Sequence, residues 1–290
     1  IINRRVTLLG RLMNWMKENK TAVITGGAGG IGLETGKRLA SEGMNVVLVD
    51  VKELNEAKEE LIKITQDESK VQVINCDVSS LKEVLLMKDE VFEKFDAVDC
   101  LMNNAGIASP GSRPWEDIDG LKSILDINFM GVVNGCHAFI PEMLKQGTSG
   151  VVINTGSKQG ITRPPGNYAY NLSKASVVAY TEALSHAFLT EENCALSAHL
   201  LIPAFVYTPM ISAFIPDKPE FAATTEETVS FFLENLKKGD FYILCPDNET
   251  PRNIDEKRIQ WMADDIIKNR PAMSRWHPDF EKEFKDFMES

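Results

Sequence analysis

Length, composition and charge limit the class of protein before any motif is considered. The chain has 290 residues, of which 43% are hydrophobic, and a formal net charge of −11. This size provides one large core but no room for a second full domain, and the negative charge argues against nucleic acid as a partner, since its binding needs a positive surface.

The cysteines and the apolar runs indicate a reducing compartment. The five cysteines are odd in number, widely spaced and mostly within apolar segments. This pattern favours reduced core thiols over a disulfide framework or a metal site. No apolar run reaches the roughly 18 residues that suggest a membrane span. We therefore expect a cytoplasmic protein that needs no metal.

Residues 1–20 predict an N-terminal helical extension. Ile2, Val6, Leu9, Met13 and Met16 fall on one helical stripe, with arginines and lysines nearby. Such a stripe more often packs on its own domain or on a partner subunit, and we favour that interpretation. A basic helix lying on a membrane surface is the alternative.

Residues 20–41 predict a strand, a glycine turn and a helix. A short apolar run over residues 20–25 leads into Gly-Gly-Ala-Gly-Gly-Ile-Gly at 26–32, and residues 33–41 have a helical pattern. Gly26, Gly30 and Gly32 permit a tight turn and let a pyrophosphate approach the helix start. A flexible glycine loop is the alternative, but the flanking strand and helix favour a phosphate-bearing ligand.

A second apolar run ends in Asp50, twenty-four residues after Gly26. A dinucleotide site places its ribose-binding acid at about this distance. A carboxylate there accepts hydrogen bonds from ribose hydroxyls and repels a 2′-phosphate, which favours NAD(H) over NADP(H). Lys52 keeps NADP(H) open, and Asp50 could alternatively be a loop residue that closes the strand.

The alternation of apolar runs with helical stretches predicts an α/β fold. The strand-like runs are 21–25, 45–50, 71–76, 98–102, 150–155, 197–202 and 241–245. They predict a single Rossmann-type, doubly wound parallel sheet of about seven strands with helices on both faces. We assign residues 21–250 to this domain and residues 251–290 to a C-terminal helical extension, packed on the same domain or on an oligomer partner.

Tyr170 and Lys174 have the spacing of a redox site for carbonyls and alcohols. On a helix, Lys174 lies one turn beyond Tyr170, where its positive charge favours the phenolate. The spacing alone is weak, because it also occurs on ordinary amphipathic helices. Ser157, thirteen residues before Tyr170, adds a hydroxyl, although it could simply terminate the strand over residues 150–155.

Four motifs occur together in one order: Thr25 with the glycine turn, Asn103-Asn104-Ala105-Gly106, Ser157, and Tyr170 with Lys174. Across residues 21–210 the chain resembles the short-chain dehydrogenase/reductase superfamily.

This resemblance implies that Tyr170 is the general acid/base and that Ser157 holds the substrate oxygen. Lys174 would bind the nicotinamide ribose and lower the pKa of Tyr170. Asn128 matches the fourth catalytic position of the family and would hold a water that links Lys174 to solvent. Its alternative is a bond to backbone inside a helix.

The resemblance also implies a set of cofactor contacts: Gly26, Gly30, Ile31, Gly32, Asp50, Asp77, Val78, Asn104, Ala105, Gly106, Tyr170, Lys174, Pro203, Val206 and Thr208. Asp77 matches the acid that meets the adenine amino group. Asn103 either belongs to the loop beneath the ribose or ties neighbouring strands together. Ala204 departs from the family, which usually has glycine there, so local geometry or affinity could differ. Tyr168 lacks a lysine four residues on and is expected to pack beside the pocket.

Three variable segments, 109–115, 159–165 and 208–221, are largely apolar and point to the substrate. Met210, Ile211, Phe214 and Ile215 suit a lid over a hydrophobic ligand, and Arg163 is the only basic candidate nearby. We therefore expect a neutral, hydrophobic secondary alcohol or its ketone. Packing of these residues in an oligomer interface is the alternative.

The C-terminal extension predicts two helices that cap a substrate pocket or an oligomer interface. His277 between them could reach an active site, but a structural histidine is the favoured interpretation. The function predicted overall is an NAD(H)-dependent oxidoreductase. A regulatory or scaffold protein that binds NAD(H) is the alternative from another class. The resemblance also implies a homodimer or homotetramer through the helices that carry Asn128 and Tyr170.

Overall fold

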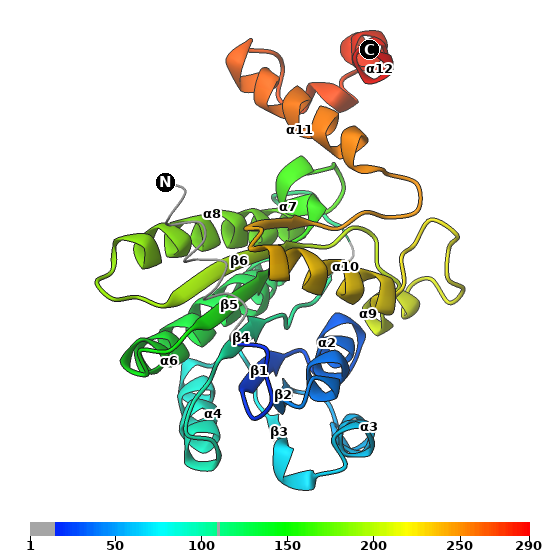
Figure 1. Cartoon of the computed structure of the whole chain (residues 1–290). Helices are drawn as coiled ribbons and strands as arrows, with labels where there is room; N and C mark the ends of the chain where they lie inside the picture. The colour runs from blue at the N-terminus through cyan, green and yellow to red at the C-terminus, as the bar shows by residue number, and fades with distance from the viewer. Residues whose placement is uncertain (1–14, 109–110) are drawn as a thin grey trace.

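The computed structural model describes residues 15–108 and 111–290. One seven-stranded sheet has the order β3-β2-β1-β4-β5-β6-β7, and every neighbouring pair is parallel (Figure 1). The strands are β1 (Thr21–Thr25), β2 (Asn45–Asp50), β3 (Val71–Asn75), β4 (Cys100–Asn103), β5 (Gly150–Thr155), β6 (Leu196–Ile202) and β7 (Tyr242–Leu244). The predicted doubly wound sheet is confirmed.

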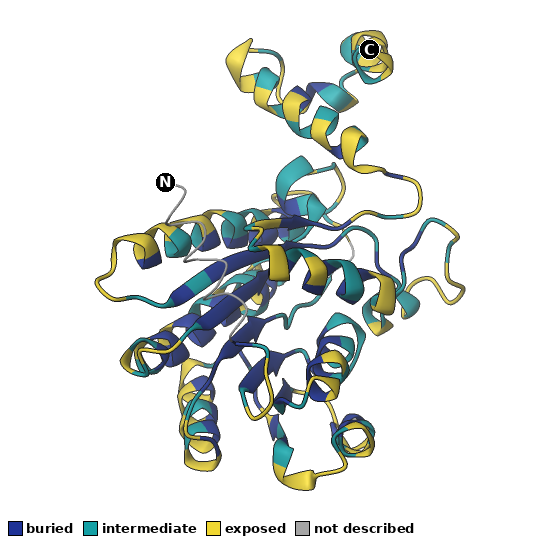
Figure 2. Cartoon of the chain, viewed as in Figure 1, coloured by how far each residue is buried: buried dark blue, intermediate teal, exposed yellow. Residues whose placement is uncertain are grey.

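The three central strands, β1, β4 and β5, bury both of their faces. In β1, Val23 packs into one core, whereas Ala22 and Ile24 pack into the other. Successive side chains of a strand point to opposite faces, so an apolar run without alternation needs cover on both sides. Figure 2 shows these strands as the most buried part of the molecule.

Helices provide that cover in two layers (Figure 1). One face is covered by α4 (Leu81–Lys94), α6 (Gly131–Lys145) and α8 (Tyr168–Thr190), and the other by α2 (Gly30–Ser41), α3 (Asn55–Thr65) and α10 (Thr225–Lys238). Val84, Phe139 and Val177 fill the first core. Leu39, Leu61 and Phe232 fill the second.

One helical run departs from the expectation about membrane spans. The run over residues 118–145 joins α5 (Ile118–Leu125), a π-helical turn (Asp126–Met130) and α6. By length and composition it could cross a membrane, with a mean hydropathy of 1.2. Phe139 and Met143 of this run are fully buried in the first core, so its apolar character is explained by packing against the sheet.

Of the N-terminal extension, only residues 15–20 lie within the described part of the chain. Trp15 is 1% exposed and belongs to the second core, with Met16 packed beside it. These two residues therefore pack on the parent domain. The rest of the predicted stripe, and with it the membrane alternative, lies outside the described residues.

The C-terminal extension contains the two predicted helices, α11 (Arg252–Ile267) and α12 (Glu281–Glu289), which project away from the sheet (Figure 1). Trp261 is 2% exposed, its indole nitrogen donates to Ser274 Oγ over 2.8 Å, and the rings of Phe284 and Phe287 lie 5.2 Å from it. The extension therefore has a small core of its own.

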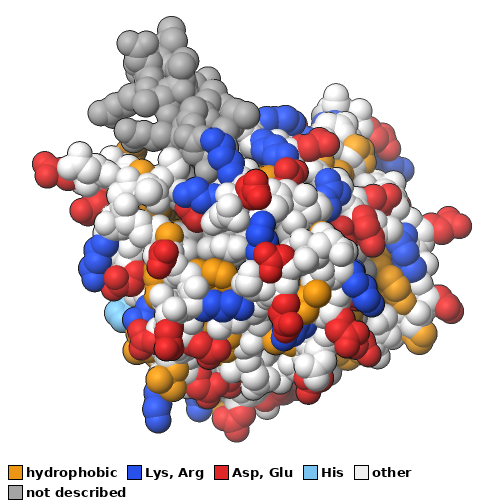
Figure 3. Space-filling view, turned by 60° about the horizontal axis from the view of Figure 1, so that its bottom comes forward, with side chains coloured by type: hydrophobic (Ala, Val, Ile, Leu, Met, Phe, Trp, Pro, Cys, Tyr) orange, Lys and Arg blue, Asp and Glu red, His pale blue; other side chains and the backbone are white. Residues whose placement is uncertain are grey.

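The cysteines and the surface charges fit the composition. All five cysteines are free thiols, and four of them are buried. Burial raises the pKa of Cys76 to about 11, which keeps that thiol protonated and unreactive at neutral pH. Acidic and basic side chains are interspersed over the face drawn in Figure 3.

Candidate active site

The turn between β1 and α2 has the geometry of an anion site. Gly26 and Gly30 adopt φ values of +71° and +58°, which residues with a side chain rarely adopt. A Cβ atom at Gly32 would lie 2.2 Å from the carbonyl oxygen of Gly26. Helix α2, which begins three residues before the predicted start, has no side-chain cap and no acidic residue in its first turn. Its first amides and positive dipole end are therefore available to a phosphate.

Asp50 lies at the end of β2, beside this turn. Its Oδ2 accepts a hydrogen bond from the amide of Ala28 over 3.1 Å, and its Oδ1 accepts one from the amide of Lys52 over 3.0 Å. Asp50 therefore closes the strand end, and it also lines the pocket described below. Its binding to a ribose stays a prediction.

The loop after β4 is held beneath the turn by Thr25. The hydroxyl of Thr25 accepts hydrogen bonds from the amides of Asn104 and Ala105 over 2.9 and 3.0 Å. Asn103 points elsewhere: it is 2% exposed and its side chain donates to Asn154 Oδ1 over 2.9 Å. Asn103 therefore ties neighbouring strands together, which was one of its two predicted roles.

These segments enclose a pocket of about 550 Å³ at the carboxyl ends of the strands, where doubly wound sheets bind ligands. The predicted residues that line it are Gly26, Gly30, Ile31, Asp50, Asp77, Val78, Asn104, Ala105, Gly106, Ser157, Tyr170, Lys174, Pro203, Val206 and Thr208. Gly32 and Asn128 are the two predicted residues outside this lining. Gly32 contributes through its close approach to Gly26.

Ser157 and Tyr170 meet at the wall of the pocket. Ser157 caps the short helix α7 (Lys158–Thr162), where its Oγ accepts a hydrogen bond from the amide of Gln159 over 3.1 Å. Tyr170 lies in the first turn of α8 and forms a side-chain hydrogen bond with Ser157. Burial raises the pKa of Tyr170, and the bond with Ser157 opposes this rise. The two hydroxyls are placed to share one ligand oxygen.

Lys174 lies one turn after Tyr170 and is 4% exposed. Its Nζ donates to the carbonyl oxygen of Thr155 over 2.8 Å and lies 5.8 Å from the centre of the Tyr170 ring. Burial lowers the pKa of Lys174 to about 8. Burial dominates the pKa of the phenol and the carbonyl of Thr155 engages the ammonium, so a lowering of the Tyr170 pKa by Lys174 stays a prediction.

Asn128 lies in the π-helical turn and is fully buried. Its Oδ1 accepts from the amide of Ile107 over 2.7 Å, and its Nδ2 donates to the Ile107 carbonyl over 2.9 Å and to Ser173 Oγ over 3.2 Å. The side chain therefore fastens the loop after Gly106 to α8, as in the structural alternative. A water held near Lys174 stays a prediction. Single π-helical turns often occur at functional sites.

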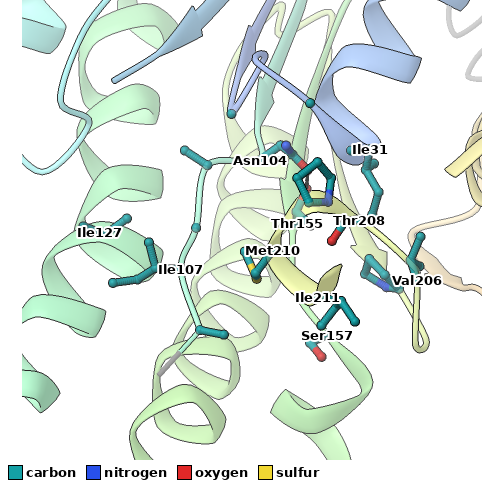
Figure 4. Close-up of a pocket in the computed structure, with 18 of the residues that line it drawn as sticks. Ile31, Asn104, Ile107, Ile127, Thr155, Ser157, Val206, Thr208, Met210 and Ile211 are labelled. Carbon is teal, nitrogen blue, oxygen red and sulfur yellow. Dashed lines mark hydrogen bonds between the residues drawn. The ribbon is translucent and has the colours of Figure 1, made fainter. Parts of the chain in front are cut away.

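The other half of the pocket is apolar. Ile107, Ile127, Phe205, Met210, Ile211 and Phe214 line it. Figure 4 shows Ile107 and Ile127 on one side of the pocket and Ile31, Val206 and Thr208 on the other. No arginine is among the described residues of the lining, and Arg163 lies outside it.

Residues 208–221 contain the predicted lid, of which Met210, Ile211 and Phe214 line the pocket and Ile215 does not. Both ends of the segment are anchored. The amide of Tyr207 donates to the carbonyl of Ala223 over 2.9 Å, and the rings of Phe205 and Phe221 lie 5.1 Å apart. The Tyr207 hydroxyl also donates to the carbonyl of Pro216.

Tyr168, His277 and Ala204 were also singled out in the sequence. Tyr168 lies outside the pocket lining and its hydroxyl donates to the carbonyl of Asp117 over 3.3 Å. His277 also lies outside the lining, and its Nδ1 accepts from the amide of Asp279 over 3.2 Å. Ala204 lines the pocket without a positive φ.

Sequence reasoning did not single out Asn167, Ile107 and Ile127, all of which line the pocket. Ile107 follows Gly106 and Ile127 precedes Asn128, so extending the recognised motifs by one residue would have found both. Asn167 is the N-cap of α8, where its side chain accepts from the amide of Tyr170, and a helix-start signal could have indicated it.

Comparisons with known proteins agree with this geometry. Residues 20–219 match the model of the short chain dehydrogenase family. The chain is 35% identical over 177 residues to the Mycobacterium tuberculosis protein that carries the oxidoreductase name SadH, a match that covers 61% of this chain and 63% of that protein. It is 25% identical to 1-deoxy-11-beta-hydroxypentalenate dehydrogenase of Streptomyces exfoliatus, over 89% of this chain and 94% of the relative.

Among solved structures, a short chain dehydrogenase/reductase from Burkholderia phymatum in complex with NAD superimposes with a TM-score of 0.75. The two chains are 27% identical, and the match covers 87% of this chain and 96% of that one. The order of the strands, the glycine turn and the family match over 200 residues lead to one conclusion: this chain belongs to the short chain dehydrogenase family.

Proposed function

We propose that this protein is an NAD(H)-dependent oxidoreductase that transfers a hydride between nicotinamide and a hydrophobic secondary alcohol or ketone. Its membership in an oxidoreductase family is the background. The observation that carries the proposal is the meeting of Ser157, Tyr170 and Lys174 at one pocket that also has a set of apolar lining residues. Hydroxyl groups are needed only where a reacting oxygen binds, and the apolar wall suits the rest of a neutral substrate.

The pocket fits a dinucleotide. The uncapped start of α2 offers amides to a pyrophosphate, and the approach of Gly32 to Gly26 leaves no side chain in the way. Asp50 has a carboxylate at the pocket wall where a ribose hydroxyl would donate to it. When bound, NAD(H) supplies or accepts the hydride.

The chain's own residues handle the proton and the oxygen. In the oxidation direction Tyr170 accepts the proton of the substrate hydroxyl, and in the reduction direction it returns a proton to the carbonyl oxygen. Ser157 donates a hydrogen bond that fixes this oxygen. The charge of Lys174 stabilises the phenolate once the ammonium turns from Thr155 toward the phenol and the ribose.

The cofactor preference rests on one charge. Asp50 puts a negative charge where a 2′-phosphate would bind, which supports NAD(H). Lys52 also lines the pocket and would attract that phosphate. NADP(H) therefore remains the alternative for the same enzyme.

The substrate class is inferred from the wall of the pocket. Large apolar side chains line the pocket, and no arginine among the described lining residues is available for a phosphate or carboxylate. One relative is named as a dehydrogenase of 1-deoxy-11-beta-hydroxypentalenate, and this name describes a substrate that carries a hydroxyl group. We propose a substrate in which an alcohol or ketone is attached to a mainly hydrocarbon body.

The test is turnover of NAD(H) with a panel of hydrophobic secondary alcohols and their ketones, followed by NADH absorbance. Tyr170→Phe should abolish turnover and leave NADH binding nearly intact, because only the reacting hydroxyl is lost. Tyr168→Phe is the matched control, since it removes a phenol two residues away on the same helix but outside the lining, and it should keep activity.

Two results would count against the proposal. Full activity of Tyr170→Phe would remove the acid/base role. A silent panel with intact NADH binding would favour the regulatory or scaffold protein. We also propose a cytoplasmic location, which the mixed-charge surface supports. We propose a homodimer or homotetramer, which the exposed leucines on α8 support.

A further inference from the structure

Lys158 directly follows Ser157 in the chain, and its side chain is turned away from the pocket. It is 14% exposed and contacts two carboxylates, with Nζ 2.6 Å from Asp255 Oδ2 and 3.5 Å from Asp247 Oδ2. The side chains of Asp255 and Asp247 are only 4% and 12% exposed. Arg258 Nη1 lies 3.8 Å from Asp255 Oδ1 and balances the second negative charge.

In a cluster this deeply buried, each charged side chain needs an oppositely charged neighbour. Each charge has lost most of its hydration, so each depends on its partners for compensation. Removing Lys158 would take from Asp255 and Asp247 the cation that they share, and would leave Arg258 and Arg275 as the positive groups that act on Asp255. The geometry of the segment that carries Lys158 is therefore tightly fixed by residues on the other side of the cluster.

That segment is α7, a helix of five residues. A single helical turn is not stable alone, so its position depends on tertiary contacts. The amide of Lys158 donates to the carbonyl of Pro203 over 3.2 Å, and a Cβ atom at Gly160 would lie 2.6 Å from the backbone of Lys174. Displacing α7 would therefore move the Ser157 hydroxyl and disturb the turn that holds Lys174.

The two acids belong to the end of the chain. Asp255 lies in the first turn of α11, which packs against α7, and Asp247 lies in the loop that follows β7. Within the described residues, none from 251–290 lines the pocket. The extension can influence the chemistry only through a contact such as this one. The small core around Trp261 gives α11 a firm base from which to present Asp255.

We propose that Lys158 is a positioning residue: its ion pair with Asp255 anchors α7 on the C-terminal extension, its contact with Asp247 adds the loop after β7, and both thereby fix Ser157 for hydride transfer. This inference rests on the proposed function, in which Ser157 holds the substrate oxygen.

The first test separates kcat from KM in Asp255→Asn and Lys158→Met. A misplaced Ser157 should lower kcat by about 10-fold to 100-fold, while the KM for NADH, whose contacts lie elsewhere, stays within about twofold. The double variant should lose no more than the worse single variant, because both remove the same anchor. Lys158→Arg keeps the charge and should retain most of the kcat. Arg252→Met removes an exposed ion pair of the same helix and should match the wild type.

The second test is amide hydrogen exchange of residues 158–162, which needs no turnover. In Asp255→Asn these amides should exchange about tenfold faster, as expected for a less stable local opening. Variants that melt earlier but keep their kcat would overturn the inference, and so would unchanged exchange in α7. A wild type without turnover would count against the proposed function instead, and exchange alone would then decide whether the extension anchors α7.

Discussion

At the scale of single residues, the site is governed by where buried charges find partners. Lys174 is an ammonium with little exposure that donates a hydrogen bond to the carbonyl of Thr155. Asp50 has both oxygens bonded to backbone amides, one from Ala28 of the glycine turn and one from Lys52, two residues further along the chain. The effect of each side chain on protein stability or on cofactor binding can therefore be measured separately from catalysis.

We predict that Asp50→Asn alters the choice of cofactor more than the fold. The amide oxygen of asparagine can still accept from Ala28, but the negative charge is lost. Since hydrogen bonds to charged groups are stronger by about 1 kcal/mol, the Kd for NADH should rise by about 5-fold to 10-fold, while NADPH binding should improve. Cofactor titration by fluorescence measures both, and Lys52→Ala should have the opposite effect on NADPH. An unchanged ratio would remove Asp50 from the ribose site.

We predict that the stability contributed by Lys174 depends on pH. Burial lowers its pKa from 10.5 to about 8, which corresponds to a cost of about 3 kcal/mol for the buried charge. Below pH 8 this lysine is protonated in the native and unfolded states, and the cost is constant. Between pH 8 and 10.5 the unfolded chain binds a proton that the native protein does not, so native stability rises with pH.

Lys174→Met should therefore unfold at a higher urea concentration than the wild type at pH 7. Its free energy of unfolding should rise by the cost of the buried charge, less about 1 kcal/mol for the lost hydrogen bond. The advantage should shrink when the pH is raised to 10. Urea unfolding of both proteins at the two pH values measures this difference. A gap that does not depend on pH would show that the lysine is not strained by its burial.

At the scale of elements, the loop over residues 208–221 determines the apolar end of the pocket. Its base is closed by backbone pairing between Val206 and Ala223 and by the contact of Phe205 with Phe221. The Tyr207 hydroxyl adds a bond to the carbonyl of Pro216 inside the loop. The loop is therefore fixed at its ends and held across its middle by one side chain.

We predict that Tyr207→Phe loosens this loop without disturbing the cofactor. Losing one hydrogen bond of about 1 kcal/mol should raise the KM for the hydrophobic substrate about fivefold and leave the Kd for NADH unchanged. Steady-state kinetics with one hydrophobic substrate at varied concentration measures the change in KM. Tyr242→Phe is the matched control, because its hydroxyl contacts Glu182 at the surface. Equal KM values in both variants would show that the bond does not shape the pocket.

The elements were predictable where a local pattern fixed them. The run over residues 45–50 matches β2 residue for residue, because a buried strand bounded by turn signals has few alternatives. The run over 98–102 was shifted relative to β4, since Val98 and Asp99 are buried but precede the first residue of the strand. Asp99 instead accepts from Lys20 and from the amide of Thr21, a contact between distant residues that no local pattern indicates.

At the scale of the whole molecule, sequence reasoning failed where the fold brings distant side chains together. Lys158 and Asp255 are ninety-seven positions apart and meet only because α11 packs on α7. The rise that burial causes in the pKa of Tyr170 was not foreseen either, because tertiary packing decides which groups enclose a phenol. The motif residues themselves were found because their order along the chain is specific.

The expected oligomer also belongs to this scale, and two exposed surfaces can be tested against each other. Leu172 on α8 is 46% exposed on the helix that also carries Tyr170, and Ile266 and Ile267 at the end of α11 are 81% and 74% exposed. Since the extension does not line the pocket, an interface is the remaining role that its sequence predicted for it. Exposed apolar patches of this kind mark surfaces that associate.

We predict a homotetramer that uses both surfaces. A tetramer with D2 symmetry is a closed assembly that contains two different isologous interfaces. Leu172→Glu should reduce the mass measured by light scattering to that of a dimer, and so should Ile266→Glu combined with Ile267→Glu. All three substitutions together should give a monomer, since a charge placed within an apolar interface is costly. If only Leu172→Glu dissociates a dimeric wild type, the extension is not an interface, and its anchoring of α7 would be its only predicted role. A monomeric wild type would reject both surfaces.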